Sequence, residues 1–285
     1  MTEEQIKWFE NLVKDRQDSA KTLEKHSMRG VKTSVVEKYS DQAHFIYELL
    51  QNADDAKATK SEFVLEKDGL FFKHNGSVHF TVSNPETEES DNNDNKLGHI
   101  NSITSVGSSN KNDQSTIGKF GVGFKAVFQY TETPHIYDRH FQFKIERFIV
   151  PVKLMKDIER LENETVFYFP FDKNEMPADK AYSDVLGKLK SLNYPILFLS
   201  SLKEVKWTAN GESGIYSQKI IGKIQEEGSI TYKNLELSQQ IGLELKREKL
   251  LLFSRQIEGQ IHSYSVGFFL EKGKLKQKNL PACIY

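Results

Sequence analysis

Apolar residues near the N-terminus recur at the three- and four-residue spacing of one helix face: Ile6, Phe9, Leu12 and Val13. Thr2 and Gln5 have the spacing of a capping box, so this helix is expected to begin beside them. A second helix is expected to open at Ser40 or Asp41, whose side chains can accept hydrogen bonds from first-turn amides. It should run to about Ala56.

Short apolar runs predict strands over most of the remaining chain. Residues 63–65 and 70–72 flank Asp68-Gly69, a pair that supplies the positive φ of a tight turn, so they predict a β-hairpin. Later strand-like runs, with one helical interruption at 180–192, are residues 141–145, 148–152, 165–171, 204–208, 250–253 and 263–270. Helices come early and hairpins late, without βαβ alternation. This order favours an α+β layered sandwich over a parallel doubly wound sheet.

Polar stretches and the C-terminal composition suggest how the chain is divided. Residues 16–38 are weakly patterned, and residues 84–95 are acidic, rich in turn formers and expected to be a loop. We expect a first domain over residues 1–200 and a β-rich extension, or the start of a following domain, over 201–285. Because the final NLPACIY is an apolar run without a polar tail, the chain is expected to be a fragment of a longer polypeptide.

Composition narrows the classes of protein. Of 285 residues, 38% are hydrophobic and 28% charged, and no apolar run approaches the roughly 18 residues of a membrane span. The N-terminus lacks a signal peptide, so a cytoplasmic location is expected. A net charge of −1 provides no overall field for nucleic acid or a membrane, so any phosphate must be held locally. The single cysteine, Cys283, excludes an internal disulfide and a multi-cysteine metal site.

The stretch ELLQNADDAKAT, residues 48–59, has a polar and an apolar side. At about 100° per residue, Glu48, Asn52 and Asp55 share one helix face. Ile46, Leu49, Leu50 and Ala53 form the opposite stripe, and Asp54 points elsewhere, either to solvent or to a structural role. A carboxylate can deprotonate a water, and an amide oxygen is a suitable ligand for Mg²⁺. A solvated helix face has the same pattern, so this helix alone leaves both interpretations open.

A glycine-studded segment comes directly before another helical pattern: Gly118, Lys119, Phe120, Gly121, Val122, Gly123 and Phe124. Glycine lets the backbone approach an anion, and a helix N-terminus presents free amides, so the segment suits phosphate. Its spacing is neither that of a Rossmann loop nor that of a P-loop. The preceding polar residues 108–113 are long enough to be a lid, and a flexible turn is the alternative.

His74-Asn75-Gly76 lies between these two segments, at the end of the predicted strand 70–73. An acceptor side chain here could bind the amino group of adenine, and Gly76 would let the chain turn beneath the base. A hairpin turn is the alternative interpretation.

Taken in order, ELLQNADDA, HNG and IGKFGVGF resemble the N, G1 and G2 boxes of the ATPase superfamily that includes gyrase B, the ninety-kilodalton heat-shock chaperones, histidine kinases and MutL. ELLQNADDAKAT and IGKFGVGFKAVFQYT are most similar to the sacsin-type and NO VEIN-type branch, whose members are mostly very large. The resemblance covers about residues 39–171. It implies a Bergerat fold, a two-layer sandwich in which a mixed, mostly antiparallel sheet carries helices on one face and ATP lies beneath a lid.

The resemblance also implies a role for each matching residue. Glu48 would be the general base that activates the hydrolytic water, and Asn52 the Mg²⁺ ligand. Asp55 would lie near the nucleotide, and Thr165 would support the adenine-binding group. The amides of residues 118–124 would surround the phosphates.

The middle box departs from the family pattern. Relatives generally have an aspartate that accepts the adenine amino group, whereas this chain has His74-Asn75-Gly76. Asn75 is placed at the aspartate position, followed by Gly76, with His74 as the alternative. An asparagine is neutral, so its hydrogen bond should be weaker than the charge-assisted one by about 1–2 kcal/mol.

Together the motifs favour a Mg²⁺-dependent ATP-binding domain over residues 1–200, with slow hydrolysis and lid closure as the conformational output. The alternative is a nucleotide-gated interaction module that binds ATP without hydrolysis, against which Glu48 argues. A histidine kinase would need a phospho-acceptor histidine, and His26 is poorly placed in a helical stripe. The expected partners are ATP or ADP, and a protein client or further domains of the same polypeptide.

Three lysines are near the glycine segment and are candidates for contact with the γ-phosphate: Lys111, Lys119 and Lys125. Lys111 and Lys125 are expected to be solubilising surface lysines instead. A chaperone-like role or a part in antiviral defence rests on family analogy alone.

Overall fold

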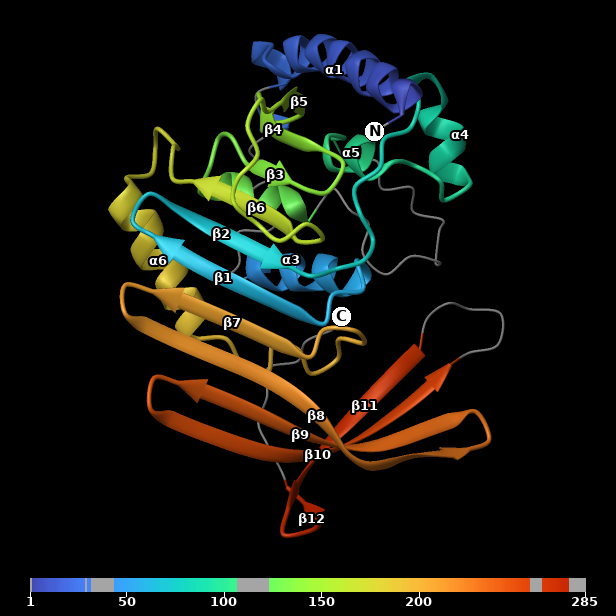
Figure 1. Cartoon of the computed structure of the whole chain (residues 1–285), viewed down its shortest axis with the longest axis vertical. Coiled ribbons are helices and arrows are strands. Elements are labelled where there is room, and N and C mark those ends of the chain that lie inside the picture. Colours follow the sequence, from blue (N-terminus) through green and yellow to red (C-terminus); the bar gives the residue numbers. More distant parts are fainter. Residues whose placement is uncertain (1, 29, 32–43, 107–122, 257–262, 277–285) are drawn as a thin grey trace.

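The computed structural model describes residues 2–28, 30–31, 44–106, 123–256 and 263–276. These residues form an α+β fold with several helices and a large open sheet (Figure 1). The helices are α1 (Glu3–Leu23), η1 (His26–Met28), α3 (His44–Asp55), η2 (Pro85–Thr87), α4 (Glu88–Asn93), α5 (His99–Ile103), η3 (Phe124–Gln129) and α6 (Ala178–Lys190). The strands are β1 (Lys60–Glu66), β2 (Gly69–His74), β3 (His135–Tyr137), β4 (Gln142–Glu146), β5 (Val150–Lys153), β6 (Thr165–Pro170), β7 (Glu204–Ala209), β8 (Glu212–Glu227), β9 (Ile230–Ile241), β10 (Glu244–Gln256), β11 (Ser263–Glu271) and β12 (Lys274–Leu275).

The described strands form one continuous sheet in the order β12-β11-β10-β9-β8-β7-β1-β2-β6-β3-β4-β5. Among them, β1 and β7 pair in parallel and the other neighbours are antiparallel. In Figure 1 the sheet runs from β5 at the top to β12 at the bottom, with α1 across its upper end and α3 and α6 behind its middle strands. The predicted α+β class and mostly antiparallel sheet are therefore confirmed.

Helix α1 begins where the capping box predicts. The Gln5 amide donates to the Thr2 hydroxyl at 3.2 Å, and the Thr2 amide donates to the Gln5 side chain at 2.9 Å. The helix continues to Leu23, so the weakly patterned stretch that starts at residue 16 begins inside this helix. Arg16 and Ala20 extend the buried stripe of the first turns. Because arginine is charged, its position is not recognised as part of a buried stripe from the sequence alone.

The acidic segment 84–95 was expected to be a loop, but it contains η2 and α4. Asn84 caps η2, because its side chain accepts from the Glu86 amide at 3.2 Å. Acidic residues in the first turn of α4, among them Glu88 and Glu89, suit the positive end of the helix dipole. An acidic composition rich in turn formers is thus typical both of a loop and of a helix N-terminus.

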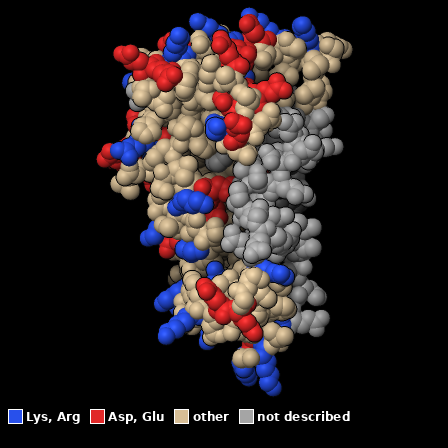
Figure 2. Space-filling view, turned by 90° about the vertical axis from the view of Figure 1, so that its right-hand side faces the viewer, with Lys and Arg blue, Asp and Glu red and all other residues tan. Residues whose placement is uncertain are grey.

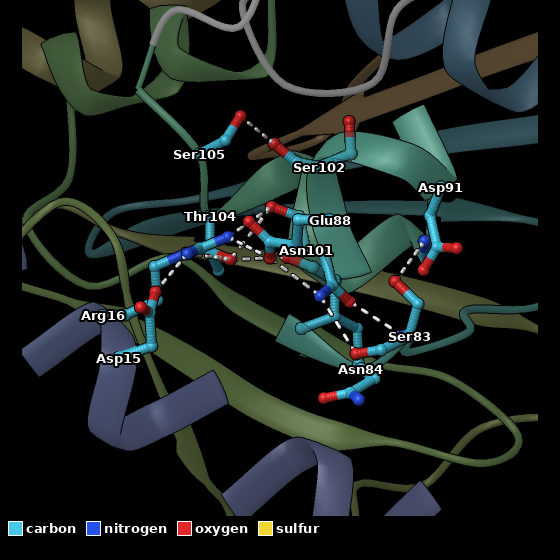
Figure 3. A network of polar contacts seen from close by, with 12 residues as sticks. Asp15, Arg16, Ser83, Asn84, Glu88, Asp91, Asn101, Ser102, Thr104 and Ser105 are labelled. Carbon is cyan, nitrogen blue, oxygen red and sulfur yellow. Dashed lines mark hydrogen bonds and ion pairs between the residues drawn. The ribbon is translucent and has the colours of Figure 1, made fainter. Parts of the chain in front are cut away.

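Buried Arg16 fastens α1 to this segment and to α5 (Figure 3). Its guanidinium forms ion pairs with Asp15 and Glu88 and donates to the Thr104 hydroxyl at 3.3 Å. Asn101 continues the network, because its amide donates to Glu88 at 2.8 Å and its carbonyl oxygen accepts from the Ser83 amide at 2.9 Å. The network joins four stretches of chain, and its bonds to Arg16 and Glu88 are charge-assisted.

The hairpin β1–β2 forms in the predicted place, with pairing from Ser61–His74 to Glu66–Gly69. Neither Asp68 nor Gly69 has a positive φ, so the expected reason for the Asp-Gly pair was wrong. A Cβ at Gly69 would lie 2.6 Å from the Tyr168 ring on β6. Glycine is required here by close packing between strands.

The main core lies between the sheet and the helices behind it. Phe63, Phe72 and Phe167 of neighbouring strands share it with the apolar stripe of α3. The same cluster continues past residue 200 through Leu202, Val205, Trp207, Ala209 and Tyr216. The expected division between residues 1–200 and 201–285 stays a prediction, but β7 from the second part lies directly beside β1.

The surface carries both signs of charge. Figure 2 shows acidic and basic side chains intermixed over the described residues of one face, in keeping with the formal net charge of −1. Within the described part of the chain, no helix is both long enough and apolar enough to cross a membrane.

Candidate functional site

Helix α3 presents the three polar residues that its spacing groups together. Its apolar stripe of Ile46, Leu49, Leu50 and Ala53 is fully buried in the core. Burial on one side sets the rotation of the helix, so Glu48, Asn52 and Asp55 project from another side. Asn52 is 6% exposed, and its carboxamide is not hydrogen-bonded to any other described residue.

Gly123, the residue before η3, touches the carboxylate of Glu48. A Cβ built on Gly123 would lie 1.8 Å from Glu48 Oε2 and 2.3 Å from its Cδ. Only a residue without a side chain allows this approach. The end of the glycine segment and the polar face of α3 therefore meet, although they are far apart in the sequence.

The rest of the glycine segment is outside the described residues: Gly118, Lys119, Phe120, Gly121 and Val122, together with Lys111 and the expected lid at 108–113. Cys283 and the capping residues Ser40 and Asp41 are outside as well. The expected helix after the glycines is a 3₁₀ helix, η3. Phe124 at its start is 1% exposed and packs its ring 6.0 Å from Phe167, which anchors the segment to the sheet.

Asp55 has one carboxylate oxygen, Oδ2, that is buried and has no hydrogen-bond partner among the described residues. Burial, with smaller contributions from Asp54 and Glu48, raises the pKa of Asp55 to about 7. A buried oxygen without a donor is costly. Asp55 is therefore suited to bond to a donor group of a ligand.

Of the two roles expected for Asp54, solvent exposure or a structural role, the structure shows the second, because Asp54 is only 8% exposed. Its carboxylate accepts from the amides of Ser200, Ser201 and Leu202 at 3.0, 2.6 and 2.7 Å, and from the Ser200 hydroxyl at 2.9 Å. These bonds fix the turn that leads into β7. The helical spacing correctly separates Asp54 from the polar face, but it gives no information about the turn at residues 200–202 to which Asp54 binds.

Asn75 turns towards the start of β1. Its carbonyl oxygen accepts from the amides of Thr59 and Lys60, both at 2.9 Å, and its amino group donates to the Thr59 hydroxyl at 3.0 Å. Both ends of the carboxamide are thus engaged within the protein. The structure does not bring Asn75 together with the polar face of α3.

His74, the alternative at this position, is 5% exposed and lies opposite Thr165 in the pairing of β2 with β6. Its Nδ1 accepts from the Gly76 amide at 3.1 Å. Gly76 itself lies against the end of α3, where an added Cβ would be 2.7 Å from the Ala56 carbonyl oxygen. The H-N-G turn therefore packs against the C-terminal end of α3.

Thr165 donates from its hydroxyl to Asp138 at 2.7 Å. Asp138 is fully buried; its carboxylate also accepts from the Phe80 amide at 3.1 Å and lies 3.0 Å from His79 Nδ1. Sequence reasoning missed Asp138, because no motif spacing relates it to Thr165. Strand pairing of β3 with β6 brings the two together.

Lys125 is buried, contrary to the expectation of a surface lysine. It is 1% exposed, and its Nζ donates to the Phe148 carbonyl oxygen at 2.8 Å and lies 4.7 Å from the centre of the Phe148 ring. Burial, with a smaller contribution from Arg16, lowers the pKa of Lys125 to about 7. Lys125 therefore fixes η3 in the core and is not available for a phosphate in this arrangement.

The geometry defines an α+β fold in which Gly123 contacts Glu48 on the Glu-Asn-Asp face of α3, and an H-N-G turn packs against the end of that helix. A family model described as "Sacsin domain" matches residues 27–146. The chain is 35% identical to Protein NO VEIN of Arabidopsis thaliana over 116 residues, which are 39% of this chain and 4% of that protein. It is 30% identical to sacsin of Homo sapiens over 125 residues, which are 40% of this chain and 3% of that protein. Residues 27–146 thus resemble a sacsin domain, and this region contains Glu48, His74 and Gly123 but not Thr165.

Proposed function

We propose that the polar face of α3 binds ATP with Mg²⁺ and hydrolyses it slowly. The observation that carries this proposal is the contact of Gly123 with the Glu48 carboxylate. A glycine segment suits phosphate, and a carboxylate beside it is chemically suited to act on a water near the terminal phosphate. The similarity of residues 27–146 to a sacsin domain supports the pairing of these two segments in one site.

Each residue of the α3 face has a separate task in this proposal. Glu48 takes a proton from the attacking water as general base. Asn52 holds Mg²⁺ through its amide oxygen, and its lack of a described partner fits that role. The metal, when bound, neutralises phosphate charge. Asp55 accepts from a ligand donor through Oδ2, the oxygen that is otherwise without a partner.

The domain is proposed to act as a nucleotide-binding module of a larger polypeptide. The chain spans 3–4% of the length of the two relatives, so the activities of those whole proteins are not carried over. The partners proposed are ATP or ADP, and a protein client or further domains.

Calorimetry with ATP, in the presence of Mg²⁺ or of a chelator, tests binding first. The wild type should bind ATP more tightly with Mg²⁺. Glu48→Gln keeps the size of the side chain and removes the base, so ATP affinity should change little while phosphate release falls about 100-fold. Glu66→Gln, an exposed position at the far end of β1, is the matched control and should leave both unchanged.

The outcomes separate the two functional classes. If the wild type binds no ATP, the proposal is wrong. If ATP binds but wild type and Glu48→Gln release phosphate at the same background rate, the domain is instead a nucleotide-gated module without hydrolysis.

A further inference from the structure

A row of three polar residues crosses the core face of the sheet beside the H-N-G turn. Ser61 on β1, His74 on β2 and Thr165 on β6 are direct neighbours in the strand pairing. They are 4%, 5% and 1% exposed. Next along the same face lie the aromatic residues Phe63, Phe72 and Phe167. A buried polar row at the end of an aromatic face needs partners for its polar atoms.

The hydrogen bonds of His74 determine what its ring offers. Because Nδ1 accepts from the Gly76 amide, the proton of the neutral ring is on Nε2. Burial lowers the pKa of His74 to about 4, so the ring is neutral near pH 7. The rings of Phe72 and Phe167, centred 5.9 and 6.0 Å away, hold it in place. His74 therefore carries its N–H donor on Nε2.

The neighbours of His74 offer complementary groups. The Thr165 hydroxyl donates to Asp138, so its oxygen keeps lone pairs that can accept a hydrogen bond. The Ser61 hydroxyl is buried without a hydrogen-bond partner among the described residues, as is Asp55 Oδ2. Ala56, which follows Asp55, contacts Gly76. These two unsatisfied oxygens thus belong to segments that meet at this turn.

We propose that His74 determines base specificity by donating from Nε2–H to an unprotonated ring nitrogen, N1 of adenine, while Thr165 accepts from the exocyclic amino group. This inference rests on the proposed nucleotide site and names its base-reading residue. Guanine carries a hydrogen on N1, so a donor would face a donor. Asn75 cannot take the role in this arrangement, since both ends of its carboxamide are engaged.

Four triphosphates distinguish a donor at His74 from an acceptor. Purine riboside triphosphate keeps N1 but lacks the amino group, and 1-deaza-ATP has C–H in place of N1. By calorimetry with Mg²⁺, we expect purine riboside triphosphate to bind within about fivefold of ATP, because it loses one neutral bond. We expect 1-deaza-ATP and GTP to bind at least about tenfold more weakly, because they leave a buried donor unsatisfied.

Two variants assign the effect to His74. His74→Phe keeps a ring without a donor and should bind ATP and 1-deaza-ATP equally. His74→Gln carries an N–H at similar reach and should retain the preference for ATP. Asn75→Ala is the matched neighbour and should also retain it. Thermal unfolding establishes that each variant is folded. If His74→Phe does not fold, the affinities of the wild type for the four triphosphates test the inference by themselves.

The failure of this inference differs from failure of the proposed function. If ATP binds, and 1-deaza-ATP binds as tightly, His74 does not read N1 and the inference is overturned. The same follows if loss of the amino group is the larger effect. If no triphosphate binds, ATP included, the proposed function fails and the inference fails with it.

Discussion

Gly123 and Glu48 show how a single missing side chain shapes the candidate site. The distance of 1.8 Å between a Cβ at Gly123 and Glu48 Oε2 is far below any contact distance. The buried apolar stripe fixes α3, which carries the Glu48 carboxylate, and buried Phe124 fixes the position of the adjacent Gly123. Neither element can move away without disturbing the core. The geometry of Glu48 therefore depends on the residue at position 123.

Gly123→Ala should displace the Glu48 carboxylate and lower ATP-dependent phosphate release by roughly 100-fold, as small misplacements of catalytic groups do. Gly187→Ala is the control, because a Cβ at Gly187 in α6 meets no atom within 4 Å. That substitution should leave phosphate release unchanged and stabilise the protein by about 0.5–1 kcal/mol. Phosphate-release assays measure the activity of both variants, and urea unfolding measures their stability. Wild-type turnover in Gly123→Ala would show that Glu48 is not positioned through this contact.

At the scale of elements, α3 is fixed from several directions. Its apolar stripe packs in the core, its end meets the H-N-G turn at Gly76, and Asp54 binds the turn before β7. The Asp54 bonds join the candidate site to the strand that lies beside β1. A helix held in this way keeps its polar face in a constant orientation.

Asp54→Asn should destabilise the protein by about 3 kcal/mol, because one of its two oxygens becomes an amino group that faces backbone amides, and charge-assisted bonds are lost. Asp18→Asn is the control. Asp18 is exposed on α1 and pairs with Lys21, so its replacement should leave the urea midpoint unchanged. Urea unfolding monitored by circular dichroism gives both free energies. Equal midpoints for Asp54→Asn and the wild type would contradict a stabilising role for this carboxylate.

For the whole molecule, hydrophobic spacing located the elements whose burial is regular. It found α1, α3 and the β1–β2 hairpin, because a periodic stripe records which face is buried. It missed α4, whose acidic residues resemble a loop, and the second half of α1, where Arg16 occupies the buried stripe. The network of Figure 3 explains how a charge can lie there.

The candidate site could be predicted only where local spacing defines it. Glu48, Asn52 and Asp55 are grouped by one helical repeat, so the sequence alone suffices to place them on one face. The nearness of Asp138 to Thr165 arises from strand pairing, which leaves no local signal in the sequence. The burial of Lys125 likewise depends on Phe148, a distant residue.

The fold as a whole depends on residues beyond position 200. Leu202, Val205 and Trp207 are fully buried in the main core, and burial of each such side chain contributes about 1.5–3 kcal/mol. Together these are comparable to the whole stability of a typical domain. A chain that ends at residue 200 also exposes the edge of β1 and leaves Asp54 without two of its amide partners. It should therefore lack a cooperative unfolding transition.

A chain that ends at residue 218 is the matched control, because it keeps β7 and the part of β8 that contains Tyr216. Tyr216 is 2% exposed, and its hydroxyl donates to the Leu189 carbonyl oxygen at 3.2 Å, which ties β8 to α6. This chain should unfold cooperatively in urea and bind ATP as the whole chain does. If instead residues 1–200 alone unfold at the urea midpoint of the whole chain, the core does not need β7. The division at residue 200 would then be a true domain boundary.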